Sequence, residues 1–149
     1  MQSLVLLTSL LLGATATPVK QRQATQAKVS NFTADTNPYG NGAWIGYDLE
    51  IPGLVSTRCG YSDATSGSTL PGIDQTSCDD PAVRWQFHQD PSQPGSEGRY
   101  RIVVIYTPAT GPGKAGFHEW APADFPQVLI ASTNETIYLG ESEFFVDLS

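Results

Sequence analysis

Two cysteines, Cys59 and Cys78, have the widest chemical repertoire in this chain, and a polar, glycine-bearing loop separates them. Such a pair can ligate zinc, form a redox centre, supply a nucleophilic thiolate or form a structural disulfide. Zinc needs a full tetrahedral ligand set, and only His88 and His118 could complete it, at none of the usual close spacings. A thioredoxin-type centre needs a C-x-x-C motif, which the chain lacks. These spacings disfavour metal and redox chemistry.

The N-terminus decides between the two remaining roles of the cysteines, a nucleophilic thiolate and a structural disulfide, because it predicts the compartment. Residues 1–16 combine an apolar stretch, Leu4 to Leu12, that is too short to span a bilayer with the small-residue triplet Ala14-Thr15-Ala16. This pattern predicts a signal peptide cleaved before Thr17, and hence a secreted, extracellular protein. A free nucleophilic thiolate rarely survives in an oxidising compartment. We therefore predict a Cys59–Cys78 disulfide, worth roughly 3 kcal/mol in the chain-entropy model.

Histidine, arginine and glutamate side chains are the candidates for acid–base catalysis. His118 and Glu119 are neighbours in a strand-like segment, so their side chains point to opposite faces and cannot act as one pair. His88 falls on the polar face of its strand, where a solvated histidine is the simpler interpretation. Arg101 with Glu119 resembles the residue types of small secreted fungal ribonucleases of the T-one type, but the motif order differs and the Glu-Gly-Phe segment is missing. We predict no catalytic residue, with a secreted hydrolase or ribonuclease as an alternative.

Carboxylates suggest two further chemistries. Asp48 and Glu50 share a face of one predicted strand, as the paired carboxylates of a glycoside hydrolase would, but a solvated polar face is the simpler interpretation. Asp79, Asp80 and Asp90 could suggest calcium, yet no D-x-D-x-D-G loop is present, and the run "CDDP" fits turn chemistry. We predict no metal site and no cofactor.

Tryptophans are the candidates for a binding site. Trp44 lies opposite the apolar face of its strand, and Trp120 lies in the Pro-rich, loop-like stretch "EWAPADFP", so either could stack on a sugar or a flavonoid. Trp85 is assigned to the core. Asn31 and Asn134 each begin an N-x-S/T sequon, which predicts surface positions open to glycosylation in a secreted eukaryotic protein.

The elements that position these residues are predicted to be β-strands. Residues 17–27 have no apolar periodicity and are predicted to form a flexible leader before a single domain over residues 28–149. The stretch "AWIGYDLEI" alternates between apolar and polar residues, and Pro52-Gly53 predicts a hairpin to "LVSTRCGY".

Further strands are predicted for "AVRWQFHQ", "RYRIVVIYT", "PQVLIAS" and "ETIYLGESEFFVDL", the last broken near Gly140. Both faces of "RYRIVVIYT" are largely apolar, which favours a central strand covered on both sides. No window has a helical apolar period, and Gly and Pro interrupt the chain often. We predict an all-β protein, a single antiparallel sandwich or barrel with one disulfide.

The charge of the chain argues against one class of partner. Its 15 Asp and Glu residues against 8 Lys and Arg residues give a net charge of −7, and the basic residues are scattered singly. Nucleic-acid affinity depends largely on clustered Lys and Arg, so no nucleic-acid partner is expected. The apolar N-terminal stretch is too short for a membrane span, so no membrane association is expected either.

The order of these segments resembles the Alternaria major-allergen (Alt a 1-like) family of small secreted fungal β-barrel proteins. The run "VSNFTA", the strand "WIGYDLEI", Cys59, a variable polar loop, Cys78 with "DDPAVRWQF" and the strand "YRIVVIY" follow one another in the same way. The terminal pattern Tyr-x-Gly-(x)3-Phe-x-Val is similar to the family's, and is met by Tyr138, Gly140, Phe144 and Val146. The resemblance covers about residues 28–148.

The resemblance implies a β-barrel or β-sandwich without established catalytic residues and with roles at the fungus–plant interface. Members are described as allergens, elicitors of plant defence, and binders of pathogenesis-related proteins or flavonoid-like molecules. The founding allergen carries more cysteines, one of them in a covalent dimer, whereas the single pair here leaves none for a disulfide-linked dimer.

These observations together predict a secreted, non-enzymatic interaction protein, an effector, elicitor or allergen-like protein acting at a host or cell surface. Its partner would be a host defence protein or a small aromatic or glycan ligand. The alternative is a small extracellular module that binds glycans or flavonoids.

Overall fold

The structure is a computed structural model that describes residues 25–37, 42–65, 67–90 and 98–149. The predicted signal peptide, residues 1–16, lies outside the described residues, as does the part of the predicted leader before Thr25. No helix within the described residues is long and apolar enough to cross a membrane. Nearly all regular structure is β-strand, which confirms the all-β prediction.

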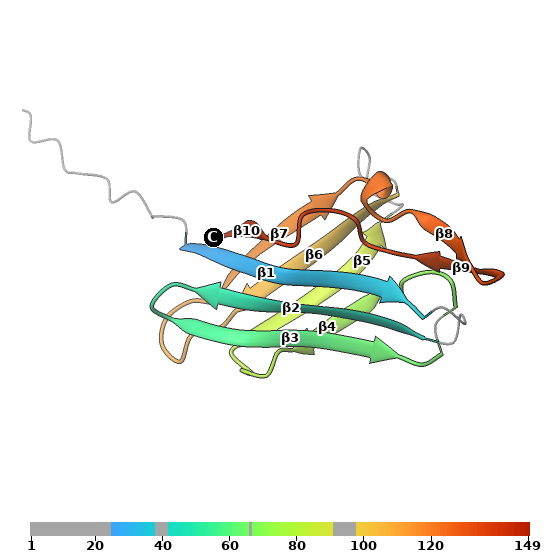
Figure 1. The fold of residues 1–149 in the computed structure, drawn as a ribbon. Helices are drawn as coiled ribbons and strands as arrows, with labels where there is room; N and C mark the ends of the chain where they lie inside the picture. The colour runs from blue at the N-terminus through green and yellow to red at the C-terminus, as the bar shows by residue number, and fades with distance from the viewer. Residues whose placement is uncertain (1–24, 38–41, 66, 91–97) are drawn as a thin grey trace, which may run out of the picture.

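Two four-stranded antiparallel sheets face each other and form the body of the fold (Figure 1). The first has the order β10-β1-β2-β3, with β10 at Phe144–Leu148, β1 at Thr25–Thr36, β2 at Ala43–Ile51 and β3 at Val55–Asp63. The second has the order β4-β5-β6-β7, with β4 at Ile73–Ser77, β5 at Val83–Asp90, β6 at Arg99–Tyr106 and β7 at Lys114–Trp120. A 3₁₀ turn at Pro122–Asp124 leads to a hairpin of β8, Gln127–Ile130, and β9, Thr133–Thr136.

The β2–β3 hairpin forms as the apolar alternation predicts. Every second residue of β2 is buried in the core, while Trp44 and Glu50 on the other face are exposed. Gly53 turns the chain between the strands at a φ of 73°, a conformation that glycine adopts without steric cost. The inward residues of β2 are Ile45, Tyr47, Leu49 and Ile51.

Aromatic side chains fill much of the space between the sheets. Trp85 of β5 is fully buried, as predicted, and its ring meets Tyr47 edge-on with centroids 5.3 Å apart. Towards one end of the sandwich, Trp120 of β7 stacks on Phe32 of β1 with centroids 4.8 Å apart. We call the group around this pair the aromatic cluster; it consists of Phe32, Tyr100, Trp120, Phe125, Tyr138 and Phe144.

Strand β1 begins earlier than the sequence predicts. Ala27 pairs with Val146 of β10 and is fully buried. The prediction of a flexible leader over residues 17–27 is therefore wrong for its last residues, and the domain begins by Thr25. Polar neighbours hide the short alternation of Ala27 with Val29, and β10, the strand that pairs with both, comes from the other end of the chain.

Two details of the second sheet also differ from the sequence prediction. β6 is central, but only its inner face is covered, since Ile102 and Val104 are fully buried whereas Val103 and Ile105 stay partly exposed. The polar stretch between the cysteines, predicted as a loop, contains the edge strand β4. Ile73 is the only apolar residue of β4, so no alternation marks it in the sequence.

The disulfide joins the two sheets along one side of the sandwich. Cys59 lies on β3, the edge strand of the first sheet, and Cys78 directly follows β4, an edge strand of the second. Beside the bond, the Asp79 amide donates to the Arg58 carbonyl over 2.9 Å. The predicted Cys59–Cys78 disulfide is confirmed, and it links the edges of the two sheets.

On the other side, β7 and β10 approach each other closely. Ala115 and Ser149 exchange two backbone hydrogen bonds, of 3.3 Å from the Ala115 amide and 3.1 Å from the Ser149 amide. A Cβ atom on the neighbouring Gly116 would lie only 2.1 Å from the carbonyl oxygen of Asp147. The approach of the two strands therefore requires glycine at this position.

Removal of the disulfide is expected to destabilise the fold. Replacing both Cys59 and Cys78 by Ala should lower the free energy of unfolding by roughly 3 kcal/mol, because the unfolded chain regains the entropy of the closed loop. Urea unfolding of the double variant and the native protein measures the difference. Thiol labelling of the unreduced native protein is the control, and two reactive thiols there would contradict the bridge.

The Gly116→Ala substitution is expected to lower the free energy of unfolding by about 1–3 kcal/mol, because its Cβ displaces the backbone of β10. Gly60→Ala on β3 is the matched control, since a Cβ there would find its nearest neighbour at 3.8 Å. Thermal denaturation compares the two. Equal stability of both variants would show that β7 and β10 are not packed as described.

Candidate ligand-binding site

A row of side chains crosses the end of the first sheet on its outer face. Antiparallel residues that pair in register point to the same side of a sheet. The register pairs Trp44 on β2 with Asp35 on β1 and with Ser62 on β3, and an isolated bridge pairs Asp35 with Ile137. Segments far apart in the sequence thus place four side chains next to one another.

The segment after β9 is held against β1 by its backbone and by an aromatic ring. The Tyr138 amide donates to the Ala34 carbonyl over 2.9 Å. The Tyr138 ring, part of the aromatic cluster, meets Phe32 edge-on with centroids 4.8 Å apart. These contacts fix Glu135 and Ile137 beside the end of β1.

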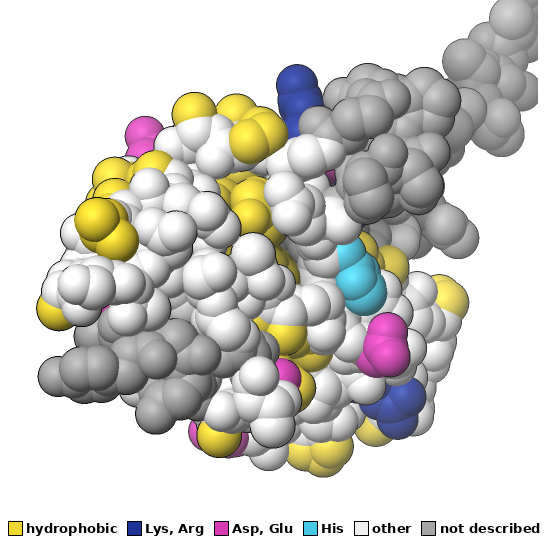
Figure 2. Space-filling model, turned by 90° about the vertical axis from the view of Figure 1, so that its right-hand side faces the viewer, with side chains coloured by type: hydrophobic (Ala, Val, Ile, Leu, Met, Phe, Trp, Pro, Cys, Tyr) yellow, Lys and Arg dark blue, Asp and Glu magenta, His cyan; other side chains and the backbone are white. Residues whose placement is uncertain are grey.

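These residues surround a hollow of about 550 Å³, which we call the Trp44 hollow. Asp35, Trp44, Asp63, Glu135 and Ile137 are among the side chains that line it. Figure 2 faces the end of the molecule at which β1 ends and β2 begins, and shows many apolar side chains and few charged ones on this end.

Trp44 is accessible in this hollow. Its side chain is 43% exposed, which confirms the predicted position opposite the apolar face of its strand. The ring lies close over Gly46, where a Cβ atom would come within 3.2 Å of the indole. The missing side chain at Gly46 makes room for the ring. That Trp44 binds a ligand stays a prediction.

Three carboxylates line the Trp44 hollow, and their surroundings differ. Burial raises the pKa of Asp35 above its ordinary value of 3.8, and a hydrogen bond with Trp44 partly offsets the rise. Asp63 Oδ1 accepts hydrogen bonds from the amide and the hydroxyl of Thr65, over 2.8 and 2.6 Å. Glu135 is only 3% exposed, and its Oε1 has no hydrogen-bond partner among the described residues.

Nothing in the sequence singles out Asp35 or Glu135 as site residues. They lie far apart in the chain, and tertiary contacts such as the bridge between Asp35 and Ile137 bring their strands together. Glu135 also stands inside the sequon that begins at Asn134, where a surface position is the natural expectation. The alternation of apolar and polar residues along a strand does not reveal that a carboxylate is buried.

Trp120 does not form the exposed platform that its Pro-rich surroundings predict. It is the last residue of β7 and is 5% exposed. Its ring packs against Phe32 and Phe144, with centroid separations of 4.8 and 5.1 Å. The expectation of an exposed tryptophan in a loop is wrong, because aromatic partners from distant strands bury it, and its indole offers little surface to a ligand.

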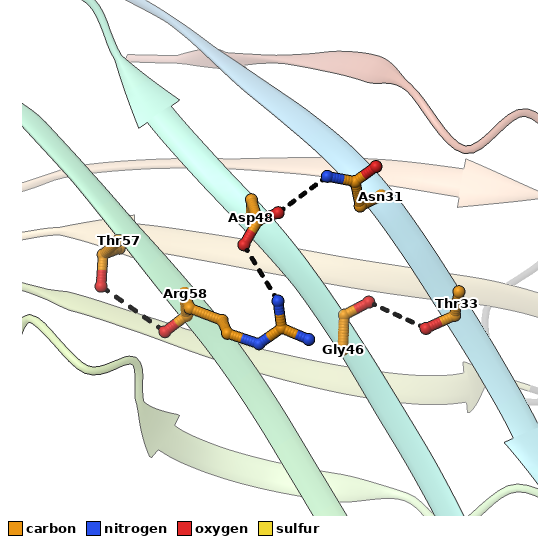
Figure 3. Close-up of polar contacts among 6 residues, drawn as sticks. All are labelled: Asn31, Thr33, Gly46, Asp48, Thr57 and Arg58. Atoms are coloured by element: carbon orange, nitrogen blue, oxygen red, sulfur yellow. Dashed lines mark hydrogen bonds and ion pairs between the residues drawn. The ribbon is translucent and has the colours of Figure 1, made fainter.

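Asp48, nearer the middle of the first sheet, is held from both sides on the outer face (Figure 3). Asn31 Nδ2 donates to its Oδ2 over 2.8 Å, and Arg58 Nη1 lies 3.3 Å from its Oδ1. Glu50, the other carboxylate of the predicted pair, is exposed. This arrangement supports the interpretation of a solvated polar face over that of a glycoside hydrolase.

Both sequon asparagines lie at the surface. Asn31 is exposed in the irregularity of β1 between Ser30 and Thr33, with a φ of 54°, and Asn134 is exposed in β9. Their positions agree with the surface location that the sequons predict. Glycosylation of either residue stays a prediction.

The structure aligns three of the acid–base candidates on the outer face of the second sheet. The register pairs His88 on β5 with Arg101 on β6, and Arg101 with Glu119 on β7. Arg101 donates from Nε to Glu119 Oε1 over 2.8 Å, and its Nη2 contacts the same oxygen. The Arg101 guanidinium also lies 5.0 Å from the ring centroid of Phe117. The two charges are thus engaged with each other.

His118 and Glu119 point to opposite faces, as predicted. The His118 ring stacks on Phe144 with centroids 4.3 Å apart. Burial lowers the pKa of His118 below 6.5, although the nearby Asp124, Glu119 and Glu141 oppose this shift. His118 is therefore a packed, largely neutral imidazole at neutral pH.

The run of Asp79, Asp80 and Pro81 forms the turn that its composition predicts. Asp80 Oδ1 accepts a hydrogen bond from the Ala82 amide over 2.9 Å. The side chain of Asp90 lies outside the described residues. In the part of the chain that the structure describes, no three His, Cys, Asp or Glu side chains are placed so that they could hold a metal ion.

Comparison with known proteins adds a likeness in architecture. No protein-family model matches the sequence, and no curated protein matches it. Among solved structures, the crystal structure of the Alternaria alternata allergen Alt a 1 is similar, with a TM-score of 0.50 and 12% identity over 90% of this chain and 95% of that chain. The two proteins share a fold. At this identity the likeness concerns the fold alone and gives no residue a role.

Protonation of Asp35 is expected to be visible through Trp44. Because burial favours the neutral carboxyl, the folded protein binds this proton more tightly than the unfolded chain. The stability contributed by this group is present at low pH and is lost as the pH rises through its raised pKa. We expect Trp44 fluorescence to titrate with a midpoint above 3.8.

Asp35→Asn is expected to remove this transition, and Trp44→Phe is expected to remove the signal. A fluorescence titration from acidic to neutral pH on the three proteins makes the comparison. A transition that persists unchanged in Asp35→Asn would assign the titration to another group.

Proposed function

We propose that this protein is an extracellular, non-enzymatic binding protein whose ligand site is the Trp44 hollow. The half-exposed indole of Trp44 is the observation that carries the proposal. A tryptophan in the wall of a concave site offers a flat apolar face that stacks on sugars and other ring compounds. A volume of about 550 Å³ lies in the usual range for small-molecule sites.

Two observations support an extracellular location. The internal Cys59–Cys78 disulfide suits an oxidising compartment, and the fold is shared with an allergen. The signal peptide predicted over residues 1–16 points the same way.

The environments of the acid–base candidates favour binding over turnover. Arg101 and Glu119 engage each other on the outer face of the second sheet, and His118 is stacked on Phe144. None of these side chains lines the Trp44 hollow. The hollow therefore lacks these three acid–base candidates and offers an indole and carboxylates as recognition groups.

The biological role that fits such a protein is that of an effector, an elicitor or an allergen-like protein at a host or cell surface. This role rests on the resemblance to the Alt a 1-like family, and it implies a host defence protein or a small aromatic or glycan ligand as partner. Both cysteines of the chain are used within it, so a dimer would have to form without a disulfide.

Trp44→Ala is expected to abolish saturable ligand binding, because it removes the open aromatic face. The native protein is titrated with cell-wall glycans and flavonoids, and binding is followed by tryptophan fluorescence and by calorimetry. Trp85 and Trp120 are 0% and 5% exposed, so quenching reports mainly on Trp44. Phe117→Ala removes an exposed aromatic ring from the other sheet and should bind as the native protein does.

A hydrolase is the second candidate function, because the register aligns His88, Arg101 and Glu119. Turnover of RNA or a cell-wall glycan that is lost in His88→Ala, without saturable quenching of Trp44, would favour the hydrolase over the binding protein. Binding that is equal in the native protein and Trp44→Ala would place the ligand elsewhere.

A further inference from the structure

We propose that the Trp44 hollow takes a cationic organic ligand, one that carries a protonated amine next to an apolar face. This inference rests on the proposed function and names the class of ligand for the same site. The carboxylates of Asp35 and Glu135 hold the amine, and the indole of Trp44 covers the apolar face.

The charge of the hollow is the first argument. Asp35, Asp63 and Glu135 line it, whereas none of the described residues that line it is Lys, Arg or His. The net charge of the chain is −7, so the field of the whole molecule has the same sign. An anionic ligand is repelled by such a site, and a cationic ligand is attracted.

Glu135 is the second argument, and it is independent of the net charge. Glu135 is only 3% exposed, and its Oε1 lacks a hydrogen-bond partner among the described residues. A buried polar atom without a partner costs free energy, and native folds supply the missing bond from protein, water or ligand. Solvent does not reach this oxygen in the free protein, so the side chain must turn toward the hollow to accept a hydrogen bond from an ammonium group, which is a donor only.

Trp44 adds the aromatic component of the site. The strand register places Trp44 beside Asp35, and both line the hollow, so the indole lies next to the carboxylate. An aromatic face attracts a cation through its ring electrons, and the carbon atoms next to an amine pack on the same face. Carboxylates beside an open indole therefore match a ligand that has both an amine and an apolar surface.

Other ligand classes satisfy these groups less completely. A metal ion needs oxygen ligands that converge on one point, and no three acidic, His or Cys side chains in the described ranges do so. A neutral sugar could stack on Trp44, but it would leave the charge of the buried Glu135 uncompensated. A ligand with an ammonium group and an apolar surface can both neutralise the Glu135 charge and stack on Trp44.

The test compares ligands that differ only in charge. A glucosamine tetramer and its fully N-acetylated counterpart share ring and linkage, but only the first carries protonated amines at mildly acidic pH. Calorimetry on the native protein is expected to show binding at least about tenfold tighter for the glucosamine tetramer, because charge-assisted hydrogen bonds are lost on acetylation. Added salt should weaken that binding.

A third ligand, spermidine, tests whether the site recognises an amino sugar or any organic amine. It carries protonated amines without a sugar ring. Binding of spermidine as tight as that of the glucosamine tetramer assigns recognition to the amine and its methylenes. Weaker binding of spermidine assigns it to an amino sugar, and either result supports a cationic ligand.

Glu135→Gln removes the buried charge and keeps the shape of the side chain. It is expected to weaken binding of the glucosamine tetramer about tenfold, with little effect on the N-acetylated tetramer. Glu50→Gln removes an exposed carboxylate from the same sheet and should bind as the native protein does. Circular dichroism verifies folding, and Asp35→Asn serves as the second variant should Glu135→Gln not fold.

Two results would overturn the inference. The first is binding of the N-acetylated tetramer that is as tight as, or tighter than, that of the glucosamine tetramer; it would leave the proposed function intact with a neutral ligand. The second is an unchanged affinity for the amine in both Glu135→Gln and Asp35→Asn. By contrast, the absence of saturable binding for every glycan, flavonoid and amine would contradict the proposed function itself.

Discussion

Aromatic packing between the two sheets is the interaction on which the candidate site depends. Trp120 stacks on Phe32, and Tyr138 meets the same Phe32 edge-on, both with centroids 4.8 Å apart. Contacts of this kind add about 0.5–1.5 kcal/mol each to the free energy of burial. The Tyr138 contact holds the chain after β9 against β1 and so helps to place Glu135 at the end of that strand. Without these contacts the Trp44 hollow would lose one of its walls.

The fold could be predicted from the sequence where alternation is local. β2 buries every second residue, and Pro52-Gly53 marks its turn into β3, so this hairpin is readable from a few neighbouring residues. β4 and the start of β1 could not be predicted, because they contain few apolar residues and depend on partners elsewhere. Ala27, for example, is fully buried and pairs with a strand from the opposite end of the chain.

The candidate site was predictable only in part, for the same physical reason. The exposure of Trp44 follows from the inward position of its neighbour Ile45, which local alternation reveals. Asp35 and Glu135 come to line the same hollow through tertiary pairing, which no local pattern encodes. The wrong prediction for Trp120 has the same cause. The neighbouring prolines indicate a loop, but the burial of Trp120 depends on aromatic rings from other strands.

The contacts that join the two sheets along both sides of the sandwich affect how the protein behaves in solution. An open edge strand presents unpaired backbone N–H and C=O groups on which another chain can form a new strand. Here the disulfide with the Arg58–Asp79 bond occupies part of one side, and the Ala115–Ser149 pair occupies part of the other. These stretches are thereby withdrawn from intermolecular strand addition, so edge-to-edge aggregation is hindered at both sides of the sandwich even before any ligand is bound.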